Sequence, residues 1–262
     1  TNYQKNLNEN FKIEFQSALQ SSKNYIQRTN PNDDLSYTNS LSTYLNLEGF
    51  NLNQIDDYFK VNLNFYQTNQ ENEDNKLIPI VFPKIKYFSG YSNKNEFITN
   101  STYEFYNIFR EKSNLTHAKK QQKISHRYSL KKDYVDFNSK IILNGVVYNQ
   151  FFNTENKLVS NDKYTTGSYY RFFPILGIRL ESPFRIKKYV SNLTIKPTLH
   201  TVLSPGASNS NKISNEDSTN NDFNTDNVFR LNRYSGNDKM DNSKRITYGL
   251  SAYTNNFNSS LY

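Results

Sequence analysis

Apolar and polar residues alternate along much of this chain with a period of two. The clearest runs are FKIEFQSAL (11–19), YFKVNLNFYQ (58–67) and LTIKPTLHTVL (193–203). Similar runs occur near 37–49, 81–91, 96–109, 133–152 and 244–253. A period of two places successive side chains on opposite faces of a sheet, whereas no stretch sustains the period of a helix. The pattern therefore predicts strands that each have one apolar face.

The predicted strands are long, and the connectors between them are polar. The runs extend over about 9 to 13 residues, compared with roughly 5 to 6 for a strand of a soluble protein. A tilted strand needs about 10 residues to cross a bilayer. Asn-rich connectors separate the runs at 29–34, 68–76, 153–163 and 204–227. We expect about a dozen strands, with an error of about two because boundaries are the weakest part of such a prediction.

Two kinds of all-β fold use strands of this type. A soluble sandwich or solenoid buries the apolar face, and a membrane barrel turns that face to lipid around a wet interior. Only 35% of the residues are hydrophobic, yet 21 Tyr and 19 Phe are present, which argues against disorder. Aromatic residues gather at both bilayer interfaces, so strand length and aromatic content together favour an antiparallel transmembrane β-barrel.

Several classes of site are missing from the sequence. There is no cysteine, and the longest near-apolar run, 172–178, is far too short for a membrane helix. The histidines, His117, His126 and His200, lack partners at metal-ligand spacing. The acidic pair Glu216–Asp217 lies in a connector, where solvated carboxylates are the norm, and no GxSxG or phosphate loop occurs. We therefore predict no catalytic residues, no metal site and no cofactor.

A basic segment, 110–132, contains eight lysines and arginines and one glutamate, in a chain whose net charge is +8. The segment could be a solvated loop, or a pair of strands that faces the interior and balances acids elsewhere. It could instead attract the phosphate or carboxylate groups of an anionic amphiphile. Nucleic acid is the least favoured ligand because no nucleic-acid module accompanies the charge. The candidate lipid-facing cations are Lys119, Lys120, Lys123, Arg127, Lys131 and Lys132.

The stretches NEDS (215–218) and NVFRLNRYSGNDKMDNSKRITYGL (227–250) resemble the C-terminal half of the outer-membrane lipopolysaccharide-assembly protein LptD family, also called organic-solvent-tolerance proteins. Matching positions are Phe229, Asn232, Arg233, Tyr234, Ser235, Gly236, Asp238, Arg245, Tyr248, Gly249 and Leu250. Lys239 stands where the family favours Arg, which keeps the charge but loses a bidentate fork. Weaker similarity covers 78–87, 170–184 and 193–205.

The resemblance implies that residues 1–262 are part of a single outer-membrane β-barrel domain, with the periplasmic jelly-roll domain and the closing strands outside this stretch. It implies passage of lipopolysaccharide to the outer leaflet of the Gram-negative outer membrane through a laterally opening barrel, without catalysis. The implied partners are lipopolysaccharide, the periplasmic bridge proteins, outer-membrane lipids and, in many lineages, a plug lipoprotein. Other readings are a porin or nutrient-receptor barrel, or a secreted or surface β-rich adhesin or carbohydrate-binding module.

The family motif leads to one further hypothesis. Arg233 and Asp238 flank Ser235-Gly236-Asn237. We expect a tight turn in which Gly236 adopts a positive φ. The opposite charges of Arg233 and Asp238 would then tie this turn inside the lumen, where salt screens them less than at an open surface.

Overall fold

A computed structural model describes residues 2–70, 73–188, 191–207, 209–219, 227–254 and 257–261. In this part of the chain the strands form one 14-stranded sheet, in which every paired neighbour is antiparallel. The strands are β1 (Asn2–Asn6), β2 (Phe11–Gln16), β3 (Ser40–Phe50), β4 (Tyr58–Thr68), β5 (Ile80–Phe88), β6 (Ser92–Lys94), β7 (Phe97–Phe109), β8 (Lys120–Asp136), β9 (Ser139–Ser160), β10 (Lys163–Glu181), β11 (Phe184–Lys188), β12 (Ser191–Leu203), β13 (Arg245–Thr254) and β14 (Phe257–Leu261). The helical turns are α1 (Tyr25–Thr29), η1 (Asp34–Tyr37) and η2 (Asn75–Leu77).

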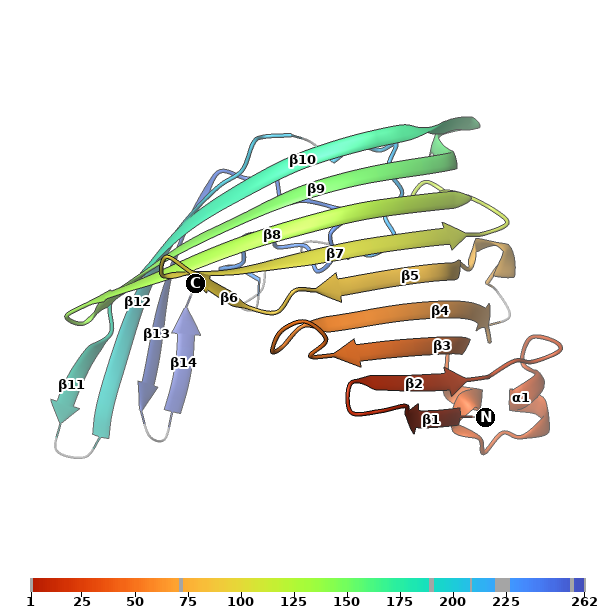
Figure 1. The fold of residues 1–262 in the computed structure, drawn as a ribbon, viewed down its shortest axis with the longest axis horizontal. Helices are drawn as coiled ribbons and strands as arrows, with labels where there is room; N and C mark the ends of the chain where they lie inside the picture. Colours follow the sequence, from red (N-terminus) through yellow and green to blue (C-terminus); the bar gives the residue numbers. More distant parts are fainter. Residues whose placement is uncertain are drawn as a thin grey trace.

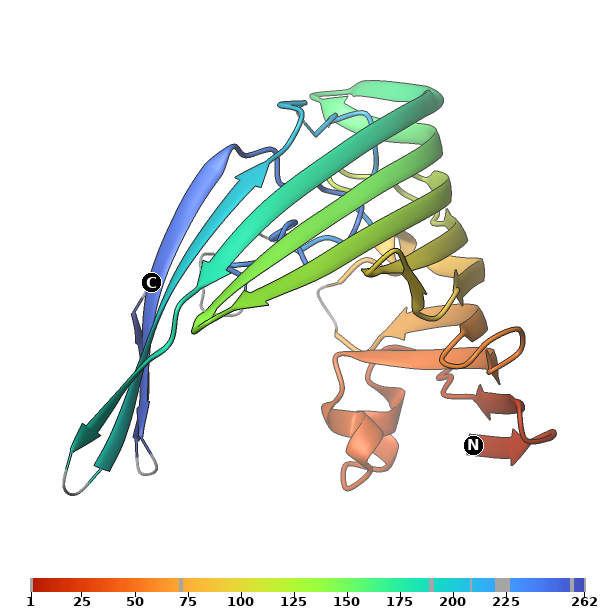
Figure 2. The same cartoon turned by 60° about the vertical axis from the view of Figure 1, so that its left-hand side comes forward.

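The strands follow one another through the sheet almost in chain order. The path runs β1-β2-β3-β4-β5-β7-β8-β9-β10-β12-β13-β14, with β6 paired to β7 and β11 paired to β12. The sheet curves into an arch whose first and last strands lie far apart (Figures 1 and 2). The prediction of a large antiparallel all-β fold is thus confirmed, but the sheet is not closed into a barrel.

The two faces of the arch differ in chemistry, as the alternation predicts. On β8, Lys123 is fully buried on the concave face, while its neighbour Ile124 points from the convex face and is 59% exposed. The residues predicted to form apolar faces on β2 and β4, such as Phe11 and Val61, are half-buried and do not enter a sealed core. Exposed apolar side chains recur along the strands at Phe15, Leu45, Phe65, Ile124, Phe151, Phe172, Leu176, Ile178, Leu199 and Ile246. No helix in the described part of the chain is long and apolar enough to span a membrane.

The three longest strands exceed the predicted lengths. β8, β9 and β10 contain 17, 22 and 19 residues. The prediction of a connector at 153–163 is wrong, because β9 continues to Ser160 and β10 begins at Lys163. The hairpin end has few apolar residues and no apolar alternation to detect, because its extended structure comes from pairing between the two strands.

The connections at one end of the strands are much longer than those at the other. The long connections are 17–39, 69–79, 110–119 and 204–244, whereas the opposite end has short turns such as 7–10 and 137–138. We call residues 204–244 the inserted segment; within it, 208 and 220–226 lie outside the described residues. This segment folds back against the concave face of the arch (Figure 2).

The main apolar core lies between the arch and the inserted segment. Val146, Tyr148, Phe173, Ile175 and Val202 project from β9, β10 and β12 and pack around Met240, with Leu231 at the edge. A smaller cluster joins Val81, Tyr106 and Ile108, with Tyr66 against it. Packing on the concave face therefore fixes the inserted segment to the middle of the sheet.

Candidate functional site

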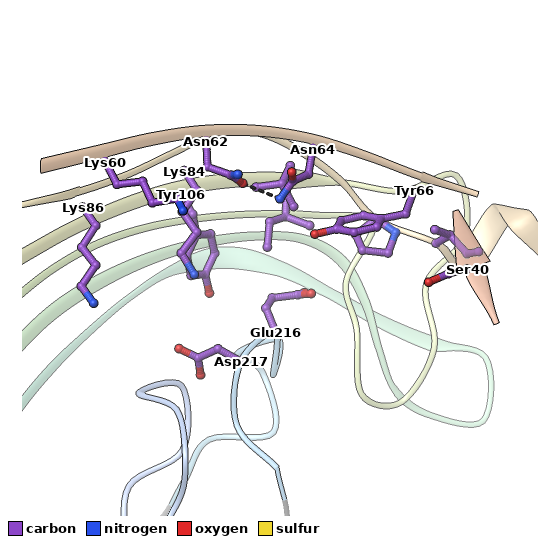
Figure 3. A pocket seen from close by; sticks show the side chains of 14 residues that line it. Ser40, Lys60, Asn62, Asn64, Tyr66, Lys84, Lys86, Tyr106, Glu216 and Asp217 are labelled. Carbon is purple, nitrogen blue, oxygen red and sulfur yellow. Dashed lines mark hydrogen bonds between the residues drawn. The ribbon is translucent and has the colours of Figure 1, made fainter. Parts of the chain in front are cut away.

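Two adjoining cavities lie on the concave face between the strands and the inserted segment. The first has a volume of about 680 Å³, and Lys60, Lys84 and Lys86 project into it from β4 and β5 (Figure 3). Glu216 and Asp217 line its opposite side from the inserted segment. The second cavity, about 750 Å³, shares Lys84, Lys86 and Asp217 with the first. Together they form a polar space beside the sheet.

Strand alternation gives the first cavity its basic wall. Even-numbered residues of β4 face inward, and an irregularity in β5 changes its inward positions from Val81 to Lys84 and Lys86. Lys60 and Lys84 therefore lie on the same side as Asn62 and Asn64. Lys60 Nζ lies 2.7 Å from Glu48 Oε1, and Lys84 Nζ lies 3.2 Å from Glu104 Oε1. Lys86 is exposed and forms no ion pair with the described residues.

A buried polar network holds the inserted segment on the sheet. Arg110 binds Glu216 through two hydrogen bonds of 2.9 and 2.6 Å, and both side chains are almost fully buried. Lys123 Nζ lies 2.8 Å from Asp238 Oδ1 and 3.4 Å from Asp217 Oδ2. Buried charges that are paired in this way fix geometry, and removing one partner leaves a charge that water cannot solvate.

Asp238 is the centre of this network. Its carboxylate accepts hydrogen bonds from Tyr106 Oη at 3.1 Å and from the Glu216 backbone N–H at 2.7 Å, in addition to Lys123. Arg171 donates to the backbone carbonyl of Asp238 at 2.8 Å and to that of Asn237 at 2.7 Å. Side chains from β7, β8 and β10 therefore converge on two consecutive residues of the inserted segment.

Acidic groups of the inserted segment have shifted pKa values. Burial alone would raise the pKa of Glu216, but hydrogen bonds from Arg110 and Ser214 and the positive charge of Arg110 lower it to about 2. Burial likewise opposes ionisation of Asp217, whose pKa is lowered by Lys123 and by the backbone N–H groups of Asn237 and Asp238. The expectation that the pair 216–217 is solvated is wrong, because both side chains are enclosed against the sheet.

The contacts that hold the motif turn 233–238 differ from the predicted pairing of Arg233 with Asp238. Arg233 Nε donates to Asp241 Oδ2 at 2.6 Å, and Arg245 Nη1 donates to the same oxygen at 2.6 Å. Asp238 instead pairs with Lys123, so the expected tie between Arg233 and Asp238 is replaced by two separate contacts. Asn232 accepts from the backbone N–H of Asp241 at 2.9 Å, which closes the loop between them.

Gly236 is required by space and not by its backbone angle. It does not adopt a positive φ, so that prediction is wrong. A Cβ atom at this position would collide with the backbone carbonyl and the carboxylate of Asp217. The neighbouring Ser235 Oγ lies 2.8 Å from Thr219 Oγ1, and Tyr234 lines the second cavity. The motif residues therefore join two parts of the inserted segment.

The six cations of the basic segment do not form one surface. Lys123 is buried, and Arg127 and Lys131 line the second cavity on the concave face. Lys120 pairs with Glu155 at 3.1 Å, and Lys132 pairs with Glu96 at 2.5 Å. Lys119 precedes β8 and is exposed. The alternation of β8 separates these residues, and a lipid-contacting role for them stays a prediction.

The histidines do not form a metal site in the described part of the chain. His117 Nδ1 lies 3.5 Å from Glu216 Oε2, and the ring of His126 stacks on Tyr103 with centroids 4.6 Å apart. His200 lies on the face of β12 opposite Leu199 and Leu203, as the alternation predicts, and it is buried there beside Phe229 of the inserted segment. Arg171 was not predicted as a site residue. It is separated from Phe173 and Ile175 by two and four residues along β10, which places all three side chains on the concave face.

An antiparallel sheet with an apolar outer face and a charged inner face is typical of outer-membrane β-barrel proteins. A model of the family described as LptD, LPS transport system D, matches residues 1–261. The chain belongs to this family, whose members transport lipopolysaccharide and assemble it at the outer membrane, where they reside, and are not enzymes. No curated protein matches the chain.

Proposed function

We propose that residues 1–262 belong to one barrel domain that spans the outer membrane and guides lipopolysaccharide through its wall to the outer leaflet. The convex apolar face would contact lipid, and the concave face would border a wet lumen. This proposal rests on the difference between the exposed apolar side chains of the convex face and the charged and polar side chains of the concave face. In barrels of this kind the long connections face outward and the short turns face the periplasm, so the end with the inserted segment is assigned to the outside.

The lysine-lined cavity is the candidate path for the charged head of the substrate. Lys60, Lys84 and Lys86 present ammonium groups to a cavity of about 680 Å³. Phosphate groups bind strongly to such donors through charge-assisted hydrogen bonds. The acyl chains would leave through a seam between strands while the head stays in this polar space. Periplasmic bridge proteins would supply the substrate, and a plug lipoprotein would bind inside the barrel in lineages that have one.

Complementation of a depleted strain tests this path. The full-length protein would carry Lys84→Gln with Lys86→Gln, and the control would carry Lys94→Gln, which is exposed on β6 outside both cavities. We expect severalfold less surface lipopolysaccharide with the double variant and no loss with the control, at equal amounts of folded protein. Equal surface lipopolysaccharide in all strains would refute the assignment of the path. Solute-selective conductance with unchanged lipopolysaccharide on depletion would favour the porin reading.

A further inference from the structure

A third and smaller cavity, about 340 Å³, lies at the end of the sheet that has the long connections. Leu115 and Thr116 line it from connector 110–119, and Lys157 lines it from β9. The inserted segment closes the other side with residues that include Tyr234, Lys239 and Asp238, whose carboxylate is already bound by Tyr106 and Lys123. This cavity shares no lysine with the two described above.

A β-bulge turns Lys157 into this cavity. Gln150, Phe152 and Thr154 alternate onto the concave face and are fully buried, which would place the even-numbered Asn156 there next. Instead, Asn156 has a φ of 51°, and the pairing of β9 with β10 shifts by one residue at this point. Lys157 consequently faces inward and is only 3% exposed. Bulges characteristically re-aim a side chain in this way.

The charge of Lys157 is not neutralised by the described residues. Its Nζ donates to the backbone carbonyl of Leu115 at 2.7 Å, and no ion pair accompanies that bond. Glu216 attracts Lys157 at a distance, but both of its oxygens are already engaged by Arg110 and Ser214. Lys239 lines the same cavity and repels Lys157. A buried ammonium without a counter-charge is costly, and a bound anion would remove that cost.

We propose that Lys157 and Lys239 form a binding site for a phosphate group at the mouth of the lumen. Two ammonium groups suit a phosphate better than a single carboxylate because the phosphate carries more charge and more acceptor oxygens. The phosphate could belong to a saccharide headgroup or be the free ion. The inference rests on the proposed function only in placing this mouth on the outer side.

Calorimetric titration of the full chain, folded in detergent, tests the site with two probes. One arm uses inorganic phosphate and the other uses glucosamine 1-phosphate, both against sodium chloride at equal ionic strength. We expect Lys157→Gln to weaken binding roughly tenfold or more, as for loss of a hydrogen bond to a charged group. Lys239→Gln should weaken binding less. The control Lys163→Gln, exposed on the same hairpin but outside the cavity, should bind like the wild type.

The two arms identify the source of the phosphate. Tighter binding of glucosamine 1-phosphate supports a headgroup site, and equal binding supports a site for the free ion. Absence of binding in both arms, or unchanged affinity in the lysine variants, overturns the proposal. If Lys157→Gln does not fold, Lys239→Gln decides, because its side chain comes from the inserted segment and not from the sheet. Surface lipopolysaccharide, measured separately, reports on the proposed function and not on this site.

Discussion

Replacing Asp238 by Asn should release the inserted segment from the sheet. The substitution keeps the shape of the side chain but leaves the fully buried Lys123 without its closest counter-charge, 2.8 Å away. Breaking a buried ion pair by removing one partner costs about 3–5 kcal/mol. Because Asp217 and Glu104 remain 3.4 and 3.7 Å from Lys123, we expect the lower end of this range, about 3 kcal/mol, or roughly a hundredfold in the docking equilibrium.

Hydrogen exchange of backbone amides measures this release directly. In the docked state the N–H of Ser214 donates to Gln121 Oε1 of β8 at 3.0 Å and the N–H of Ala118 donates to Ser214 Oγ at 2.8 Å, so exchange of both amides should accelerate by up to about a hundredfold in Asp238→Asn. The control Asp74→Asn removes an exposed carboxylate paired with Lys112, and its exchange at the same amides should match the wild type.

A double variant distinguishes the loss of the Lys123–Asp238 ion pair from a general disturbance of the fold. Combining Asp238→Asn with Lys123→Met removes the unpaired charge along with its partner, and should recover part of the protection. Unchanged exchange in Asp238→Asn, relative to Asp74→Asn, would refute the claim that this ion pair docks the inserted segment.

Three further changes act on the same segment. Gly236→Ala should undock it by collision with Asp217, and wild-type exchange rates in this variant would contradict the packing argument. The pKa of Glu216 falls to about 2 on docking, so ionised Glu216 should stabilise the docked state by about 3 kcal/mol above pH about 4.5, and this stabilisation should be lost as the pH falls towards 2. Glu216→Gln should remove this pH dependence from the rate of proteolysis of the inserted segment. The same pH dependence in the variant and the wild type would contradict a role for Glu216. Asp241→Asn should expose the 232–245 region to protease because it removes the carboxylate that Arg233 and Arg245 share, whereas equal cleavage would show that neither ion pair matters.

The two faces of the sheet could be predicted because each strand records its environment in its own alternation. Lys123 and Ile124 are neighbours in sequence and lie on opposite faces, one buried in a charged network and the other exposed. The extended tip of the β9–β10 hairpin could not be predicted, because there the two strands are held by pairing with each other and neither shows a regular apolar alternation. An apolar–polar alternation therefore predicts a strand with one face against an apolar layer, but it does not detect a strand that is extended only because it pairs with a neighbour.

The partners of the motif could not be predicted from its spacing. Asp238 and Lys123 are 115 residues apart in the chain, and no period relates an irregular segment to the strands that it covers. For the same reason Glu216 and Asp217 resemble solvated acids in the sequence, although folding buries them against the sheet. The sequence also could not predict that Lys157 faces inward, because a β-bulge changes which residues of the strand, odd-numbered or even-numbered, point to the concave face.

Spin labelling tests the central claim that the convex face meets lipid while the concave face meets water. The chain has no cysteine, so single cysteines can be introduced at Ile124 and Leu176 on the convex face and at Asn62 and Lys84 on the concave face. In lipid bilayers, the first pair of labels should be relaxed mainly by oxygen and the second mainly by a water-soluble nickel chelate. Equal relaxation of all four labels, or the reverse pattern, would contradict the account.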